Sequence, residues 1–256
     1  MFILQGAFIQ NGAPFFFGIE LDYFEFRISN CEMKKNRRLE AVLFDMDGVI
    51  VDSEPLWSDA EKQLLARRNL LYSPSLKTAM MGRDSRGAVG YLMEHYRLAE
   101  SLGELIEERN QLIAELFKEQ LKEIPGALNL VRSVIAAGIM TGLVSSSPKP
   151  LVELALEKLG ISGLFDLTLS GDQVVRGKPA PDIYVTAAEK LAVKPECCLV
   201  IEDAPHGVAA AKDAGMCCLA INTSVSVVEL AMADKVVSGF EEVDVQLLLD
   251  LMQHQS

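Results

Sequence analysis

The sequence predicts an α/β protein: a parallel sheet covered by helices on both faces, with a helical module inserted after the first strand. Short, wholly apolar runs alternate with amphipathic stretches along much of the chain, which is typical of buried parallel strands and their crossover helices. After the first apolar run, about seventy residues contain amphipathic stretches but no recognisable strand. The helical module therefore interrupts the sheet early.

The composition bounds the classes of protein to consider. The 256 residues provide for one mid-sized core and an accessory domain. A net charge of −12 argues against nucleic-acid or anionic-membrane partners, because such binding depends on Lys and Arg. The first 32 residues contain no uninterrupted apolar run of the length, about 18 residues, that a membrane span needs. Because the net negative charge repels anions, an anionic substrate must be attracted by a local cation.

The cysteines and the first 32 residues bear on location and processing. The five cysteines have no CxxC spacing, which favours reduced, packed thiols and a cytoplasmic location. The first 32 residues contain seven phenylalanines and one basic residue, Arg27, so they lack the positive start of a secretory signal. We expect Met33 to be the natural start and residues 1–32 to be an extension outside the fold.

The first strand and the helical module come next in the chain. Residues 41–44 are wholly apolar and predict a buried strand. Apolar spacing then predicts helices over 56–70, 85–96 and 102–121. The Pro125-Gly126 pair ends this module. The expected domains are a helical insertion, 55–124, and an α/β core made of 33–54 and 125–256.

The remainder of the chain alternates between the two kinds of element. The expected helices are 127–137, 150–159, 181–191 and 207–214, and the expected strands are 139–144, a strand near Leu167, 199–201, 218–221 and 236–237. In parallel sheets of this kind the active site lies at the carboxyl ends of the strands. The residues that follow each strand are therefore the candidates for function.

Two carboxylates follow the first strand. Asp45 and Asp47 are spaced i, i+2 at a strand-to-loop turn, where both can face one cleft, and Gly48 lets the backbone turn away. One carboxylate could attack a substrate while the other moves protons. A turn or helix cap is the plainer alternative. An EF-hand calcium loop is disfavoured, because its twelfth position would be Leu56 rather than Glu and no helix precedes it.

Polar residues follow other strands as well. The run 145–147 is three serines, Lys178 lies in a loop before a helix, and Glu202 and Asp203 follow the strand 199–201. Serine hydroxyls and backbone N–H groups at a helix start suit phosphate oxygens, and grouped carboxylates suit Mg²⁺. Taken singly, a serine run is most often a cap and a Lys-Pro pair a loop. Their shared position at strand ends predicts a phosphate site.

The four motifs together resemble a known family. Asp45-x-Asp47-Gly48, Ser145, Lys178-Pro179 and Glu202-Asp203 occur in that order over roughly residues 40–222. This pattern resembles the haloacid dehalogenase superfamily, in its beta-phosphoglucomutase-like, phosphatase-rich subgroup. The resemblance implies a Rossmann-like core with an inserted α-helical cap.

The resemblance also implies catalytic roles for the two aspartates. Asp45 would be the nucleophile that forms an aspartyl-phosphate. Asp47 would act as general acid and then general base, and its backbone carbonyl would bind Mg²⁺.

The implied binding residues lie on the other motifs. Ser145 and Ser146 would hold the phosphoryl oxygens, and Lys178 would neutralise the charge that develops there. Glu202 and Asp203 would complete the Mg²⁺ site with Asp45.

Residues 81–86 resemble the family's cap loop, which closes over the leaving group. Gly82, Arg83 and Arg86 are the predicted substrate contacts in this loop, and the alternative is a charged helix N-terminus.

One position separates the candidate functions. Mutases of this subgroup carry a His five residues after the aspartate that corresponds to Asp52, where this chain has Trp57. We therefore expect a phosphatase acting on a small-molecule phosphate ester, a phosphorylated sugar, and the family resemblance implies a monomer. The alternatives are a beta-phosphoglucomutase and a phosphoglycolate-type phosphatase. A non-catalytic binding module is disfavoured because both Asp45 and Asp47 are present.

Overall fold

The computed structural model describes residues 38–80, 83–223 and 226–253. The expected extension, residues 1–32, lies outside the described residues. Residues 37–255 belong to one compact unit, and the description below is confined to it.

A six-stranded parallel sheet forms the core of the described chain, in the order β3-β2-β1-β4-β5-β6. The strands are β1 (Ala41–Phe44), β2 (Met140–Val144), β3 (Leu167–Leu169), β4 (Cys198–Glu202), β5 (Cys217–Ile221) and β6 (Lys235–Val237). This arrangement confirms the predicted fold class. Phe44 at the end of β1 pairs in register with Leu143 of β2 and Ile201 of β4, so these strands end at one edge.

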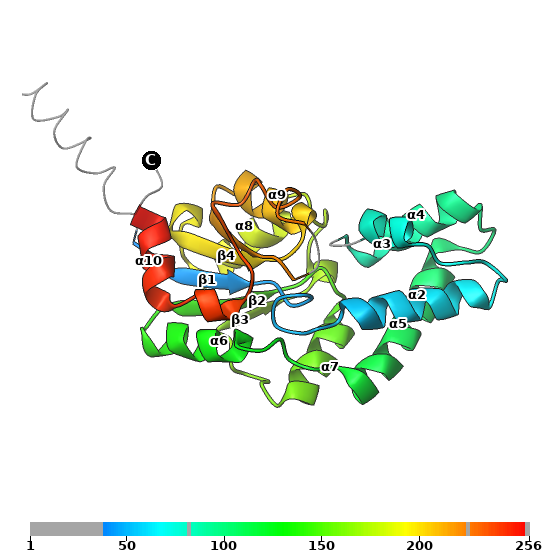
Figure 1. The fold of residues 1–256 in the computed structure, drawn as a ribbon, viewed down its shortest axis with the longest axis horizontal. Helices are drawn as coiled ribbons and strands as arrows, with labels where there is room; N and C mark the ends of the chain where they lie inside the picture. Colours follow the sequence, from blue (N-terminus) through cyan, green and yellow to red (C-terminus); the bar gives the residue numbers. More distant parts are fainter. Residues whose placement is uncertain (1–37, 81–82, 224–225, 254–256) are drawn as a thin grey trace, which may run out of the picture. The chain divides into compact units, whose positions relative to one another are not determined.

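Helices cover both faces of the sheet (Figure 1). The fully buried β1 alternates its side chains, so that Val42 and Phe44 face one apolar cluster and Ala41 and Leu43 face the other. The first cluster includes α6 (Ala127–Ala136), α7 (Lys149–Leu159) and α10 (Val245–Gln253). The second includes α8 (Asp182–Leu191) and α9 (Pro205–Asp213). Burial on both faces explains why the strands are apolar throughout.

The helical module lies between β1 and α6 in the sequence and to one side of the sheet in Figure 1. It contains α2 (Glu54–Ala66), α3 (Pro74–Met80), α4 (Ser85–Tyr96) and α5 (Leu102–Gln120). Apolar residues such as Leu64, Leu105 and Phe117 are fully buried within it. A buried ion pair, Glu61–Arg109 with an N–O distance of 2.6 Å, joins α2 to α5.

Hydrogen bonds tie the two chain segments that connect this module to the core. The N–H of Asp52, on the way out, donates to the carbonyl of Lys122 on the way back at 3.0 Å. The N–H of Ile124 donates to the carbonyl of Ile50 at 2.9 Å. The module therefore leaves and rejoins the core at one place. The exact boundary between cap and core stays a prediction.

Two helices of the structure, α3 and α10, were not predicted from the sequence. The seven residues of α3 are too few to show a clear helical period, although Pro74 is a favourable helix start. The nine residues of α10 follow Asp244, whose Oδ1 accepts from the Leu247 N–H at 2.8 Å. That capping aspartate was a usable signal. The helix expected to reach residue 70 ends at Ala66, before Asn69 takes a left-handed conformation with φ 58°.

Candidate active site

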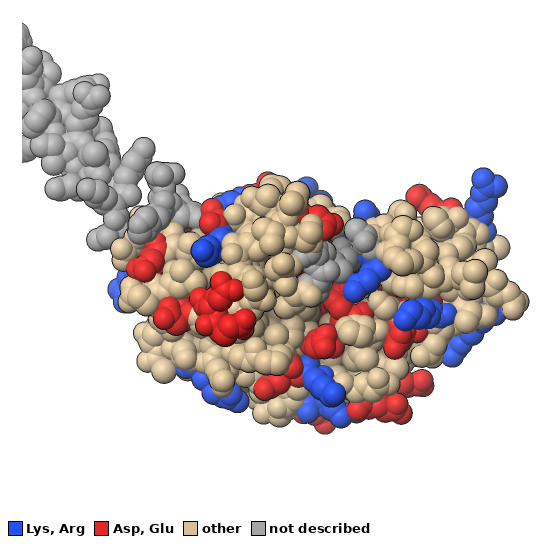
Figure 2. Space-filling view, in the orientation of Figure 1, with Lys and Arg blue, Asp and Glu red and all other residues tan. Residues whose placement is uncertain are grey.

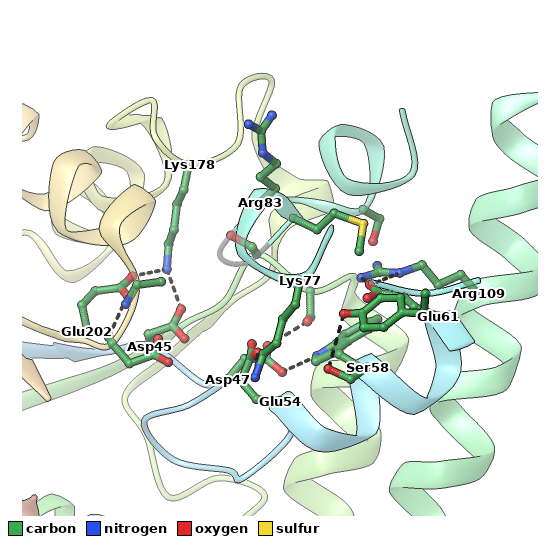
Figure 3. A pocket seen from close by; sticks show the side chains of 18 residues that line it. Asp45, Asp47, Glu54, Ser58, Glu61, Lys77, Arg83, Arg109, Lys178 and Glu202 are labelled. Atoms are coloured by element: carbon green, nitrogen blue, oxygen red, sulfur yellow. Dashed lines mark hydrogen bonds and ion pairs between the residues drawn. The ribbon is translucent and has the colours of Figure 1, made fainter. Parts of the chain in front are cut away.

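Six of the seven site residues predicted in the core meet in one pocket at the carboxyl edge of the sheet. Its sheet side is lined by Asp45, Asp47, Ser146, Lys178, Glu202 and Asp203. They come from the ends of β1, β2 and β4 and from the loop before α8. Figure 3 shows Lys178 between Asp45 and Glu202, with Asp47 nearer the residues of the cap.

Lys178 is the buried cation of this cluster. Its side chain is 2% exposed, and its ammonium donates to Asp45 Oδ1 and, at 2.7 Å, to Glu202 Oε1. Burial disfavours the charged ammonium, but the carboxylates of Asp45 and Glu202 outweigh this effect and raise the pKa of Lys178. Burial also raises the pKa of Asp45, against the attraction of Lys178. Lys178 is therefore a fixed positive charge.

Glu202 is held from several sides. Its Oε1 also accepts from the Tyr184 hydroxyl of α8 at 2.6 Å. Its Oε2 accepts from the backbone N–H groups of Asp203 and Ala204, at 3.1 and 3.3 Å, just before α9 begins. A Cβ at residue 207 would come within 1.7 Å of this carboxylate, so Gly207 leaves the space that Glu202 occupies. Glu202 thus has a clear role in positioning Lys178.

Asp45, Glu202 and Asp203 could hold a metal ion. Each offers a carboxylate oxygen, and these oxygens lie within 4.8 Å of one another. A Cβ at residue 48 would come within 1.9 Å of Asp203 Oδ2, and the backbone there has φ 80°, so the glycine makes room for this carboxylate. Oxygen ligands and the excess of carboxylates over the Lys178 ammonium suit a hard divalent cation. The donor set therefore fits such an ion.

Asp47 lies in a different environment from Asp45. Its Oδ1 accepts from the Ser53 hydroxyl at 2.6 Å and from the Trp57 indole N–H at 2.9 Å. Its Oδ2 accepts from the hydroxyls of Ser147, at 2.9 Å, and Ser145, at 3.2 Å. Both oxygens are thus oriented by hydrogen bonds, and one donor comes from α2 of the cap.

The serine loop after β2 is fixed by the end of β3. The Ser145 N–H donates to the Leu169 carbonyl at 2.9 Å, and the Gly171 N–H donates to the Ser147 carbonyl at 3.0 Å. A Cβ at residue 171 would come within 2.2 Å of the Ser146 carbonyl oxygen, so glycine permits this close approach. Ser146 lines the pocket, whereas Ser145 is fully buried beside Asp47. Phosphate binding by these two serines stays a prediction.

The three predicted cap-loop residues have different outcomes. Arg83 lines the pocket at an exposed position. Arg86 is exposed and is not among the residues that line the pocket. Gly82 lies outside the described residues. The alternative of a helix start is also present here, because Asp84 Oδ1 caps α4 by accepting from the Gly87 N–H at 2.7 Å.

The sequence did not identify the cap side of the pocket, which is lined by Glu54, Ser58, Glu61, Tyr72, Lys77 and Arg109. These residues come from α2, α3, α5 and, for Tyr72, the segment between α2 and α3. The available signal was weak: Glu61 and Arg109 are charged residues at helix positions that otherwise face the apolar interior.

Comparison with known proteins identifies the family. Residues 39–215 match the model of the haloacid dehalogenase-like hydrolase family. The chain belongs to this family.

Its relatives include phosphatases. It is 36% identical over 178 residues to a phosphorylated carbohydrates phosphatase of Thermotoga maritima, covering 70% of this chain and 82% of the relative. It is 31% identical over 191 residues to hexitol phosphatase B of Escherichia coli K12, covering 72% and 84%. The predicted enzyme class, a phosphoric monoester hydrolase, is confirmed.

Solved structures agree with this assignment. A beta-phosphoglucomutase from Clostridium difficile superposes with a TM-score of 0.75 at 25% identity, covering 84% of this chain and 97% of that one. CbbY from Rhodobacter sphaeroides in complex with phosphate superposes with a TM-score of 0.73 at 26% identity, covering 80% and 96%. The predicted subgroup is therefore confirmed as well.

Glu54 provides a stability prediction. Burial raises the pKa of Glu54 to about 7, with Lys77, 3.5 Å away, opposing the shift. The folded protein thus holds this proton more tightly than the unfolded chain. The resulting stabilisation is complete below the unfolded pKa, near 4.5, and is lost as pH rises through about 7. We expect wild type to lose up to about 3 kcal/mol of unfolding free energy relative to Glu54→Gln between pH 4.5 and 8.

Urea unfolding of both proteins across this pH range would measure the difference. Glu94→Gln, at an exposed position of α4, is the control and should follow wild type. Parallel stability curves for wild type and Glu54→Gln would contradict the assignment.

Proposed function

We propose that the protein is a Mg²⁺-dependent phosphatase that hydrolyses small phosphorylated carbohydrates through an aspartyl-phosphate on Asp45. The observation that carries the proposal is the separation of Asp45 and Asp47. Asp45 faces Lys178 and the carboxylate cluster, whereas Asp47 faces hydroxyls and an indole N–H. Two carboxylates in such different surroundings are suited to two different tasks.

In the first step Asp45 acts as the nucleophile. A carboxylate oxygen of Asp45 attacks phosphorus, and the bond between phosphorus and the ester oxygen breaks. Asp47 gives its proton to that oxygen, so the leaving group departs as a neutral alcohol. Lys178, fixed by Glu202, stabilises the negative charge on the transferring phosphoryl group.

In the second step water replaces the alcohol. Asp47 takes a proton from water while the water oxygen attacks phosphorus, and the bond between Asp45 and phosphorus breaks. Inorganic phosphate leaves and both carboxylates return to their starting state. A bound Mg²⁺, held by Asp45, Asp203 and Glu202 with the Asp47 carbonyl, would supply positive charge that offsets repulsion between nucleophile and phosphate.

The substrate class has support from the relatives and from the charge of the chain. The names of the two relatives above refer to phosphorylated carbohydrates and to hexitols. On the face drawn in Figure 2, Lys and Arg lie among Asp and Glu, in keeping with a net charge of −12 and a small substrate rather than a polyanion.

A cytoplasmic, monomeric enzyme remains our proposal for its setting. Cys198, Cys217 and Cys218 are buried thiols outside any disulfide, which suits a reducing compartment. No described helix has both the length and the apolar character needed to cross a membrane.

Phosphate release tests the proposed function directly. We expect hydrolysis of 4-nitrophenyl phosphate and of hexose and hexitol phosphates with Mg²⁺, and background rates in excess chelator, because the carboxylate cluster repels a phosphate dianion. Asp45→Asn should fall to background. Asp59→Asn, in an exposed ion pair with Lys62, should retain activity. Full activity in excess chelator would disprove the metal dependence.

Trp57 should matter for the proton transfer by Asp47. Trp57→Phe keeps an aromatic ring but removes the N–H that donates to Asp47 at 2.9 Å. We expect kcat to fall about tenfold or more with a sugar phosphate, because the indole N–H stabilises the negative charge that develops on Asp47 as it gives up its proton. In single-turnover phosphorylation the loss should be smaller with 4-nitrophenyl phosphate, whose leaving group needs little protonation.

The control for this variant is Tyr96→Phe, which alters another aromatic residue of the cap, one that bonds the Leu71 carbonyl. It should leave both rates unchanged. Equal losses on the two substrates with Trp57→Phe would show that the indole does not act through the acid role of Asp47.

A mutase is the second candidate, favoured by the structural likeness to beta-phosphoglucomutase. With Trp57 bonded to Asp47, we expect beta-glucose 1-phosphate, if accepted, to give glucose and inorganic phosphate in equal amounts. Catalytic glucose 1,6-bisphosphate should not raise the rate. ³¹P NMR of the products separates the two functions, and conversion to glucose 6-phosphate stimulated by the bisphosphate would establish the mutase instead.

A further inference from the structure

The cap side of the pocket contains a second group of polar residues that the chemistry above does not use. Glu54, Ser58 and Glu61 of α2, Tyr72, Lys77 of α3 and Arg109 of α5 line it. Figure 3 shows Ser58, Glu61 and Arg109 on the opposite side of the pocket from Lys178. A leaving group attached to a phosphate beside Asp45 would extend toward these residues.

The cations of this group are already paired with carboxylates. Arg109 donates to Glu61 Oε1 from Nη2 at 2.6 Å and from Nε at 3.1 Å, and the two side chains are 8% and 4% exposed. The guanidinium also lies 4.2 Å from the centre of the Trp57 ring. Lys77 lies 3.5 Å from Glu54. Within this group, each cation thus has an acidic residue as its partner.

The other hydrogen-bonding groups on the cap side are neutral hydroxyls and the acceptor oxygens of Glu61. The Tyr72 hydroxyl lies 3.5 Å from the Ser58 hydroxyl. Both bonds from Arg109 end on one oxygen of Glu61, and a carboxylate has acceptor positions on both of its oxygens. These groups match the O–H donors and acceptors of a polyol.

On the cap side of the pocket, Arg83 lies outside these pairs, at the rim. Its side chain is exposed, with the guanidinium 6.0 Å from the Tyr91 ring. In Figure 3 the guanidinium points away from Glu61 and Arg109. It therefore does not add positive charge to the interior of the cap side.

We propose that the Glu61–Arg109 pair, with Ser58 and Tyr72, forms a subsite for an uncharged, hydroxyl-rich leaving group and selects against a leaving group that carries a second anion. The inference rests on the proposed phosphatase function. A second carboxylate or phosphate would face the carboxylate of Glu61 and would have to compete with it for Arg109. Such like-charge contacts disfavour binding strongly. A polyol meets no such penalty.

Two matched substrates isolate this property. Glycerol 3-phosphate and 3-phosphoglycerate differ by a hydroxymethyl group in place of a carboxylate. We expect wild type to have a kcat/KM at least about tenfold higher for glycerol 3-phosphate. Glucose 1,6-bisphosphate should likewise be a poorer substrate than glucose 6-phosphate.

Glu61→Gln then changes the charge of the subsite. It leaves the Arg109 guanidinium without its carboxylate, so the preference for glycerol 3-phosphate over 3-phosphoglycerate should shrink about tenfold. The matched control is Glu108→Gln, which removes a carboxylate that pairs with Arg67 and Arg68 outside the pocket. This control should keep the wild-type ratio.

A double variant tests the subsite without leaving one buried charge unpaired. Glu61→Gln with Arg109→Met removes the buried pair as a unit, which proteins often tolerate better than loss of one partner. It should weaken the use of glycerol 3-phosphate without improving the use of 3-phosphoglycerate. This pattern separates the effect of Arg109's charge from a general loosening of the cap.

The outcomes distinguish the subsite from the proposed function. Hydrolysis of 4-nitrophenyl phosphate together with equal or better use of 3-phosphoglycerate by wild type would overturn the subsite and leave the phosphatase in place. An unchanged substrate ratio in both Glu61 variants would also overturn it. Failure to hydrolyse any of these esters would overturn the proposed function and the subsite together.

Discussion

The ammonium of Lys178 lies between the carboxylates of Asp45 and Glu202, and this buried contact joins the ends of two strands to the loop before α8. Removing one partner of such a cluster leaves an unpaired buried charge, at a cost of about 3–5 kcal/mol. Tyr184 and the backbone N–H groups that begin the turn to α9 hold Glu202 in place. The position of the candidate nucleophile therefore depends on several elements at once.

The hydrogen bonds of Asp47 connect the chemistry to the cap. Ser145 and Ser147 hold one oxygen from the core, whereas Trp57 of α2 and Ser53, the residue just before that helix, hold the other. Any movement of α2 that carries Trp57 away from the core would remove a donor from Asp47. The orientation of this carboxylate and the position of the cap are thus physically coupled.

The charges of the pocket are balanced locally, which matters in a chain with a net charge of −12. The overall field repels an anionic substrate, so attraction must come from groups at short range. Lys178 lies on the sheet side of the pocket, while the cap side presents paired charges and hydroxyls. Under the proposed function, this asymmetry gives the two ends of a phosphate ester different surroundings, one suited to an anion and the other to a neutral group.

The sequence by itself determined the sheet, the inserted helices and the motif residues, because each depends on local order along the chain. The short apolar run 41–44 favours a buried strand, and parallel pairing with its neighbours brings Asp45, Ser145 and Glu202 to one edge. Tertiary structure alone decided the contact of Trp57 with Asp47 and the pairing of Glu61 with Arg109, 48 residues apart. Such contacts depend on how separate helices pack, and hydrophobic periodicity identifies the buried face of a helix without identifying the residue that it meets there.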